Sequence, residues 1–161
     1  MSSSDVSQGL LVWGVKASLL QYIQRMPDGV VDVDPPVVAM GNTHEFSFPL
    51  TEQSAQDRLR FSGGLRCSGH GGLLRIDIVD PELAAEDATD PLAGPWLLTI
   101  ADPYAPGSRL PFATIGRMRA SALNTLTGSD TRLTEDGADL FYAGPYTAGT
   151  VLDDPVVRGA K

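Results

Sequence analysis

The spacing of apolar residues changes once along the chain, and this change constrains the fold more than any other sequence feature. Between Trp13 and Met26, apolar residues recur at steps of three and four, as on one face of an amphipathic helix: Val15, Leu19, Ile23 and Met26. Pro27, Asp28 and Gly29 then end this pattern. The sequence therefore predicts one N-terminal helix, and a different kind of structure after it.

After residue 29 the apolar residues alternate with polar ones, which is typical of half-buried strands. The predicted strands contain the following residues: Phe46 and Phe48; Leu59 and Phe61; Leu65 and Cys67; Leu74, Ile76 and Ile78; Trp96, Leu98 and Ile100; and, more weakly, Phe112 to Met118. Thr134, followed by Glu135 and Asp136, predicts a short capped helix to about Phe141. We expect a mainly β protein, an antiparallel sandwich-like domain with one N-terminal helix and a short C-terminal helix.

Length and charge restrict the classes of function. The 161 residues suit a single domain, 1–161, with a core from about residue 10 to 156. The formal charge of −8 repels phosphate backbones, so we expect no nucleic-acid partner. No apolar stretch is long enough for a membrane span, and Met1 to Gln8 lack the pattern of a secretion signal. As written, the chain is expected in the cytoplasm, or as a secreted or cell-surface protein if a leader precedes it.

Most catalytic and metal-binding patterns fail on spacing. The segment from Cys67 to Gly71 has its glycines wrongly placed for a serine nucleophile turn or a dinucleotide fingerprint, and no phosphate-binding Gly-Lys-Ser/Thr occurs. Cys67 and His70 form a Cys-x-x-His pair, but a structural zinc ion needs four ligands and only His44 remains as a nitrogen donor. We assign no catalytic residue and no zinc site.

Three polar residues remain as candidates. Ser18 and Tyr22 are four residues apart, so a helix places them on one face, beside the apolar stripe. A tyrosine there is more often a core residue with a bonded hydroxyl than a ligand. His70 lies between Gly69 and Gly71, which leave room around its ring but also suit a tight turn or a bulge. From the residues alone, a binding role and a structural role stay open for all three.

Several segments resemble the HtaA-type haem-binding domain of actinobacterial haem uptake. The most specific is Leu11–Ser18, with Trp-Gly-Val-Lys at 13–16, leading into Tyr22 and Ile23. The others follow in the family's order: Phe61–Gly64 with Ser68–Leu73, then Ile78–Pro81, then Phe141–Pro155 with Tyr146-Thr-Ala-Gly-Thr. Pro145 stands where the family usually has an aromatic residue, and an extra aspartate, Asp153 or Asp154, interrupts its Leu-Asp-Pro ending.

The resemblance implies a binding protein for ferric haem b, not an enzyme. Tyr22 would be the axial ligand of the haem iron, His70 would bond its phenolic oxygen, and Ser18 and Tyr146 would contact the haem propionates. Leu19, Ile23 and Trp13 could line the cleft or belong to the core. The expected partners are haem and other haem-carrier or transporter proteins, and a homodimer stays open.

Two alternatives have distinct consequences. A peroxidase- or catalase-like enzyme would use His70 as acid and base, although no distal His/Arg or His/Asn pair can be named. A haem-free interaction module would keep the fold without binding haem, although such a decayed site would not need to retain Ser18, Tyr22 and His70.

Overall fold

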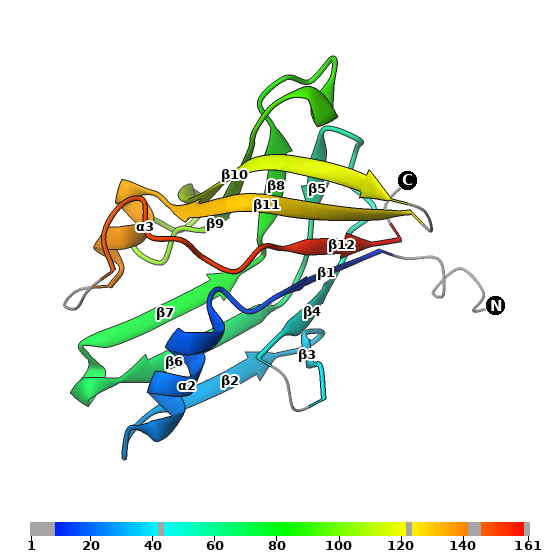
Figure 1. Ribbon diagram of the computed structural model, residues 1–161. Coiled ribbons are helices and arrows are strands. Elements are labelled where there is room, and N and C mark those ends of the chain that lie inside the picture. The colour runs from blue at the N-terminus through cyan, green and yellow to red at the C-terminus, as the bar shows by residue number, and fades with distance from the viewer. Residues whose placement is uncertain (1–8, 42–43, 122–123, 142–145, 160–161) are drawn as a thin grey trace.

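The computed structural model describes residues 9–41, 44–121, 124–141 and 146–159, and these form a mainly β structure with antiparallel strand pairing, as the sequence predicted. A large sheet contains nine strands (Figure 1). In spatial order they are β3 (Val38–Ala39), β4 (Phe46–Pro49), β1 (Leu10–Trp13), β12 (Val156–Arg158), β11 (Thr125–Leu133), β10 (Arg109–Ser121), β9 (Trp96–Ala101), β8 (Glu82–Ala85) and β5 (Arg58–Arg60).

A smaller sheet carries the elements that matter most for function. Its strands are β2 (Val30–Asp34), β6 (Gly64–Gly69) and β7 (Leu74–Val79), with β6 in the middle. Helix α2 (Ala17–Arg25) packs on β2 and β6, and a one-turn 3-10 helix, η1 (His70–Gly72), joins β6 to β7. A second such turn, η2 (Pro91–Ala93), precedes β9, and α3 (Glu135–Asp139) follows β11.

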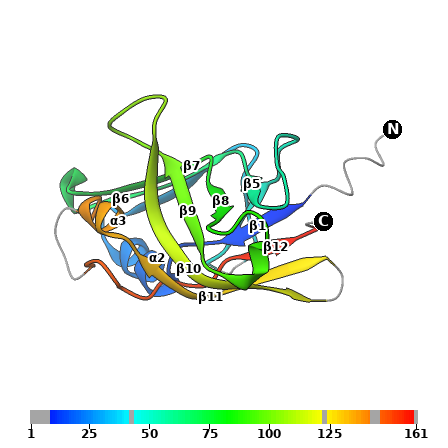
Figure 2. The ribbon, with the colours of Figure 1, turned by 90° about the horizontal axis from the view of Figure 1, so that it is seen from above.

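The large sheet curls until its two ends meet. A bridge between Leu50 and Phe61 links the end of β4 to the end of β5, and Thr51 N–H donates to the Arg60 carbonyl at 2.8 Å. Figure 2 shows the long β10–β11 hairpin bending over the molecule. Buried side chains from both sheets and from α2 form one core cluster between them.

The N-terminal helix begins later than the apolar spacing indicated. Residues 10–13 form β1, which pairs with β4 and β12, and the helix starts only at Ala17. Leu11, Val12 and Trp13 are all buried, so this stretch shows no alternation that would distinguish a strand from a helix. The predicted helical stripe from Trp13 is therefore wrong at its beginning.

The chain turns from β1 into α2 through a strained bend. Val15 has a φ of 65°, which is rare for a β-branched residue, and Lys16 N–H donates to the Gly14 carbonyl at 2.6 Å. A positive φ with this bond spanning two residues indicates a γ-turn of the less common hand. Gly14 is required as well, because a Cβ there would overlap the backbone carbonyl of His44.

The later elements agree with the predicted pattern. The five predicted pairs and triplets of alternating residues lie in or directly beside β4, β5, β6, β7 and β9, and the weaker segment Phe112 to Met118 lies within the 13-residue strand β10. Thr134 caps α3, because its Oγ1 accepts the Gly137 N–H at 2.8 Å. None of the described helices is long and apolar enough to cross a membrane.

Candidate functional site

Tyr22 and His70, which are 48 residues apart in the sequence, meet on the surface. The Tyr22 hydroxyl and His70 Nε2 share a hydrogen bond of 2.7 Å, and the two ring centroids are 5.7 Å apart with an interplanar angle of 54°. The Tyr22 side chain is 47% exposed, so it is no core residue. The pair presents an accessible phenolic oxygen that is already hydrogen-bonded to an imidazole.

Ser18 lies on the same helix, one turn before Tyr22, and is exposed. The neighbouring face of α2 is buried, with Leu19 and Ile23 in the core cluster. Trp13 is also in the core, where it packs edge-on against Phe112 with ring centroids 6.0 Å apart. These three apolar residues are therefore core residues in the structure, as one of the two sequence interpretations held.

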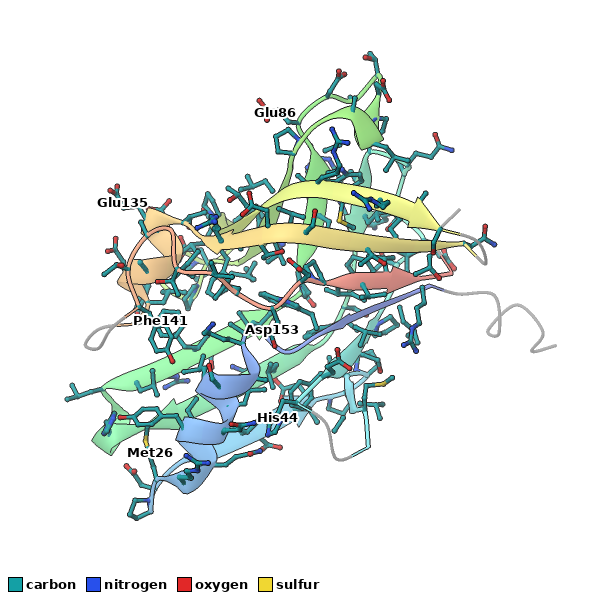
Figure 3. The ribbon with its side chains drawn as sticks, in the orientation of Figure 1. Met26, His44, Glu86, Glu135, Phe141 and Asp153 are labelled. Atoms are coloured by element: carbon teal, nitrogen blue, oxygen red, sulfur yellow. The ribbon has the colours of Figure 1, made fainter. Side chains whose placement is uncertain are left out.

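The beginning of α2 is held by the C-terminal segment. Asp153 Oδ2 accepts the Ala17 N–H at 2.8 Å, and the Asp153 backbone accepts from Trp13 Nε1 at 2.7 Å and donates to the Val15 carbonyl at 2.9 Å. Lys16 Nζ donates to the Val151 carbonyl at 2.8 Å. Figure 3 shows Asp153 at the N-terminal end of α2 and Met26 at its other end. The Trp-Gly-Val-Lys segment and the C-terminal motif thus form one structural unit.

Tyr146 lies on the C-terminal side of the site. Its half-buried ring packs on Phe141 with centroids 4.9 Å apart. Burial raises the pKa of Tyr146 above its ordinary value, and a negative charge on Tyr22 would raise it further. Tyr146 is therefore close enough to Tyr22 for a charge on one side chain to affect the other. Residue 145, the proline at which the sequence departs from the family pattern, lies outside the described residues, as do residues 1–8.

Cys67 and His70 do not converge on a metal site. The Cys67 thiol is buried in β6, whereas His70 is exposed at the end of that strand. His44 contacts α2, with its Nε2 at 3.3 Å from Gln24 Oε1. Among the described residues, no group of three or more histidine, cysteine or acidic side chains could hold a metal ion.

Two cavities differ in their relation to the pair. One of about 240 Å³ lies beside the loop that carries His70 and is lined by Gly72, Leu73, Arg75, Tyr104, Asp139 and Leu140. A larger one of about 360 Å³ lies near the tip of the β10–β11 hairpin and includes Leu59, Trp96 and Leu126. Neither cavity is lined by any of the four predicted site residues, so the smaller one is related to the pair only through Gly72 and Leu73, which follow His70 in the chain.

Two aspartates that the sequence analysis did not propose for the site contact its supporting segments. Asp153 caps α2 as described above, and Asp28 accepts the Gly71 N–H at 2.7 Å. Asp28 belongs to the Pro-Asp-Gly turn, which the sequence indicates only as the end of a helix. The sequence feature that could have indicated a role for Asp28 is its position directly after the helix that carries Tyr22.

The comparisons with known proteins identify the family and the fold of the chain. Residues 8–157 match the sequence model of the HtaA family (Htaa). The C-terminal domain of HtaA from Corynebacterium glutamicum aligns over 93% of this chain and 94% of its own, with 23% identity and a TM-score of 0.69. The domain-swapped dimer of its H434A variant aligns over 92% and 94%, with 20% identity and a TM-score of 0.59. No curated protein matches. The match over most of its length shows that this chain belongs to the HtaA family, which is associated with haem uptake.

Proposed function

We propose that this domain captures ferric haem b through the phenolate of Tyr22 and passes it to another haem carrier or transporter. The observation that carries the proposal is the 2.7 Å hydrogen bond between the exposed Tyr22 hydroxyl and His70. An exposed tyrosine on a rigid helix, already oriented by a histidine, suits an axial ligand better than a core residue.

The chemistry of the pair fits ferric iron. An unperturbed tyrosine titrates at about 10, so at neutral pH the phenolate needs a positive charge and a hydrogen-bond donor. Ferric haem supplies the charge, and His70 can donate to the phenolic oxygen once Tyr22 has lost its proton. Anionic oxygen is a hard ligand that prefers ferric to ferrous iron, so reduction would weaken binding.

Hydroxyl groups suit the propionates of haem. Ser18 is exposed on the same helix face as Tyr22, and the Tyr146 hydroxyl, whose pKa is raised above its ordinary value by burial, is protonated at neutral pH and can donate a hydrogen bond. A chain with a net charge of −8 would hold these carboxylates by neutral donors more than by a basic cluster. The ring of Tyr146, which packs on the buried ring of Phe141, adds an apolar surface for a porphyrin.

We further propose that the domain carries haem without turning over peroxide. The sequence contains two histidines. His70 is paired with Tyr22, and His44 contacts Gln24, which is two residues from Tyr22 and so projects from another side of the helix. We therefore assign neither histidine the role of an acid–base group for peroxide. The proposal also includes other haem carriers or transporters as the donors and acceptors of haem. It is compatible with a homodimer.

The test is a titration of the ligand-free protein with ferric haemin, followed by absorption spectroscopy. Wild type, Tyr22→Ala, Tyr22→Phe and His70→Ala are compared with Tyr104→Phe, a matched control because Tyr104 is 81% exposed and is not one of the proposed site residues. We expect a saturable tyrosinate-type spectrum that is absent in both Tyr22 variants, altered in His70→Ala and unchanged in Tyr104→Phe.

Other results would contradict the proposal. Identical binding by Tyr22→Phe would remove Tyr22 as ligand, and a wild-type spectrum equal to free haemin would favour an interaction module. Peroxide turnover that is lost in both Tyr22→Phe and His70→Ala would favour the enzyme instead.

A further inference from the structure

The loop that presents His70 has an unusual backbone. His70, Gly71 and Gly72 have φ values of 52°, 64° and 94°, three consecutive residues in the left-handed region. The two glycines adopt it freely, but for His70 this conformation carries a steric cost. Within the loop, the Leu73 N–H donates to the His70 carbonyl at 3.1 Å. A loop of this kind keeps one conformation only when its surroundings hold it.

The contacts that hold it come from the segment directly after α2. Asp28 Oδ2 accepts the Gly71 N–H at 2.7 Å. Met26 packs over Gly69, where an added Cβ would approach the Met26 sulfur to 2.5 Å. Met26 follows Tyr22 by four residues, so the segment that carries the tyrosine and the turn that fixes the histidine loop are continuous. The two segments are therefore joined at two points, by the Tyr22–His70 hydrogen bond and by the Asp28–Gly71 hydrogen bond.

The electrostatics of Asp28 support the same arrangement. The hydrogen bond from Gly71 N–H is the main reason why the pKa of Asp28 lies below its usual value, and the N–H groups of Asp28 and His70 and the charge of His70 lower it further. Successive backbone N–H groups in a turn can form a concave site that favours an anion. Asp28 is therefore a carboxylate at neutral pH, and its Oδ2 is the hydrogen-bond acceptor for the Gly71 N–H.

We infer that Asp28 is a positioning residue for His70, which it orients toward Tyr22 by holding the Gly71 N–H. This inference rests on the proposed function for its consequence in haem binding. It assigns Asp28 no contact with haem, because Asp28 acts through the backbone of the loop. Loss of the carboxylate would leave the His70 ring present but less often within hydrogen-bonding distance of the phenolic oxygen.

The first measurement needs no haem. NMR of the imidazole groups in the ligand-free protein can follow His70 directly, because the chain has two histidines and His70→Ala assigns the signals. We expect Asp28→Ala to shift the His70 signals toward those found in Tyr22→Phe. Asp28→Asn keeps a carbonyl acceptor for the Gly71 N–H and should stay close to wild type.

Asp87→Ala is the matched control for a general effect of removing a turn aspartate. Asp87 is also exposed, its pKa is also lowered by hydrogen bonds, here chiefly from Thr89, and it lies in the turn between β8 and η2. We expect no change of the His70 signals in this variant. If Asp28→Ala does not fold by far-ultraviolet circular dichroism, Asp28→Ser, whose shorter side chain withdraws the acceptor, replaces it.

The second measurement uses the haem-loaded protein and excess apomyoglobin as scavenger. Residues that orient a metal ligand typically change metal affinity about 10–100-fold, and Asp28 is one contact further out, so we expect haem to leave Asp28→Ala about 3–10-fold faster than Asp28→Asn. The tyrosinate spectrum of Asp28→Ala should move toward that of His70→Ala.

The two measurements separate the two proposals. Unchanged His70 signals in Asp28→Ala, or equal shifts in Asp28→Asn and Asp28→Ala, overturn the positioning role whatever haem does. Shifted signals in a protein that does not bind haemin would support the role of Asp28 and contradict the proposed function.

Discussion

Cys67 illustrates how burial controls the chemistry of a single residue. Its thiol is 1% exposed in the middle strand of the small sheet. Burial raises the pKa of the Cys67 thiol to about 12, and the negative charge of Asp77 acts in the same direction. The thiolate is the nucleophilic and metal-binding form, so at neutral pH this side chain is inert.

We therefore expect the native protein to react with an aromatic disulfide reagent at pH 7 orders of magnitude more slowly than the same protein in concentrated urea. Absorbance of the released thiolate, followed over time, measures both rates. The unfolded protein is the matched control, because it contains the same single cysteine. Rapid, stoichiometric reaction of the native protein would show that the thiol is accessible.

Individual site residues were predictable to different degrees. The shared face of Ser18 and Tyr22 follows from helical spacing alone. The contact between Tyr22 and His70 does not, because the helix and the β6–β7 turn are brought together by tertiary packing, and only the family resemblance connected them. Asp153 and Asp154 appeared as an interruption of the family's ending, yet each has its own role: Asp153 caps α2, and Asp154 accepts the hydroxyl of buried Thr131 at 2.7 Å.

At the scale of elements, α2 depends on a cap from a distant part of the chain. Lys16 occupies the N-cap position without a side-chain hydrogen bond, and the first turn of the helix contains no acidic residue. The carboxylate of Asp153 supplies the missing acceptor to Ala17 N–H and places a negative charge at the helix N-terminus. The cap also ties the C-terminal segment to the helix that carries Tyr22.

We expect Asp153→Ala to lower the free energy of unfolding by about 1 kcal/mol, the usual cost of losing a cap. Asp153→Asn is the control, since asparagine keeps the acceptor and loses only the charge, so its loss should be a few tenths of a kcal/mol. Urea denaturation followed by circular dichroism measures both variants. An equal loss in the two variants would mean that charge, not the hydrogen bond, stabilises the helix.

Elements were predictable where burial produced a pattern. The strands β7 and β9 alternate cleanly between buried and half-buried or exposed positions, and both were predicted. Strand β11 was missed because its fully buried positions are Gly128, Thr131 and Leu133, of which only one is apolar and large. Pro155 packs against Gly128, where an added Cβ would lie only 3.0 Å from the Pro155 Cδ. The buried face of β11 therefore shows no run of alternating apolar residues, because close packing around Gly128 takes the place of an apolar side chain.

At the scale of the whole molecule, the two sheets share a single core. The core cluster includes Phe48 and Trp96 of the large sheet, Leu65 and Ile76 of the small sheet, and Leu20 of α2. The apolar side chains of the small sheet are buried in the core that it shares with the large sheet, so the small sheet depends on the large one for its stability. Because the site is built on α2 and on the turn of the small sheet, its geometry depends on this shared core.

This shared core predicts that the small sheet does not open before the rest of the molecule. Trp96 reports on the large sheet through its fluorescence, and Cys67 reports on the small sheet, because its thiol reacts only when β6 is exposed. Both measurements are made in Trp13→Phe, in which Trp96 is the remaining tryptophan. We expect the free energy of opening measured by thiol labelling in dilute urea to equal, within about 1 kcal/mol, the free energy of unfolding measured by Trp96 fluorescence. Labelling of wild type is the control for the Trp13 substitution. A clearly lower value from thiol labelling in both proteins would mean that the small sheet and α2 form a separate unit, and that the 161 residues contain two cooperative parts instead of the one domain that the sequence predicts.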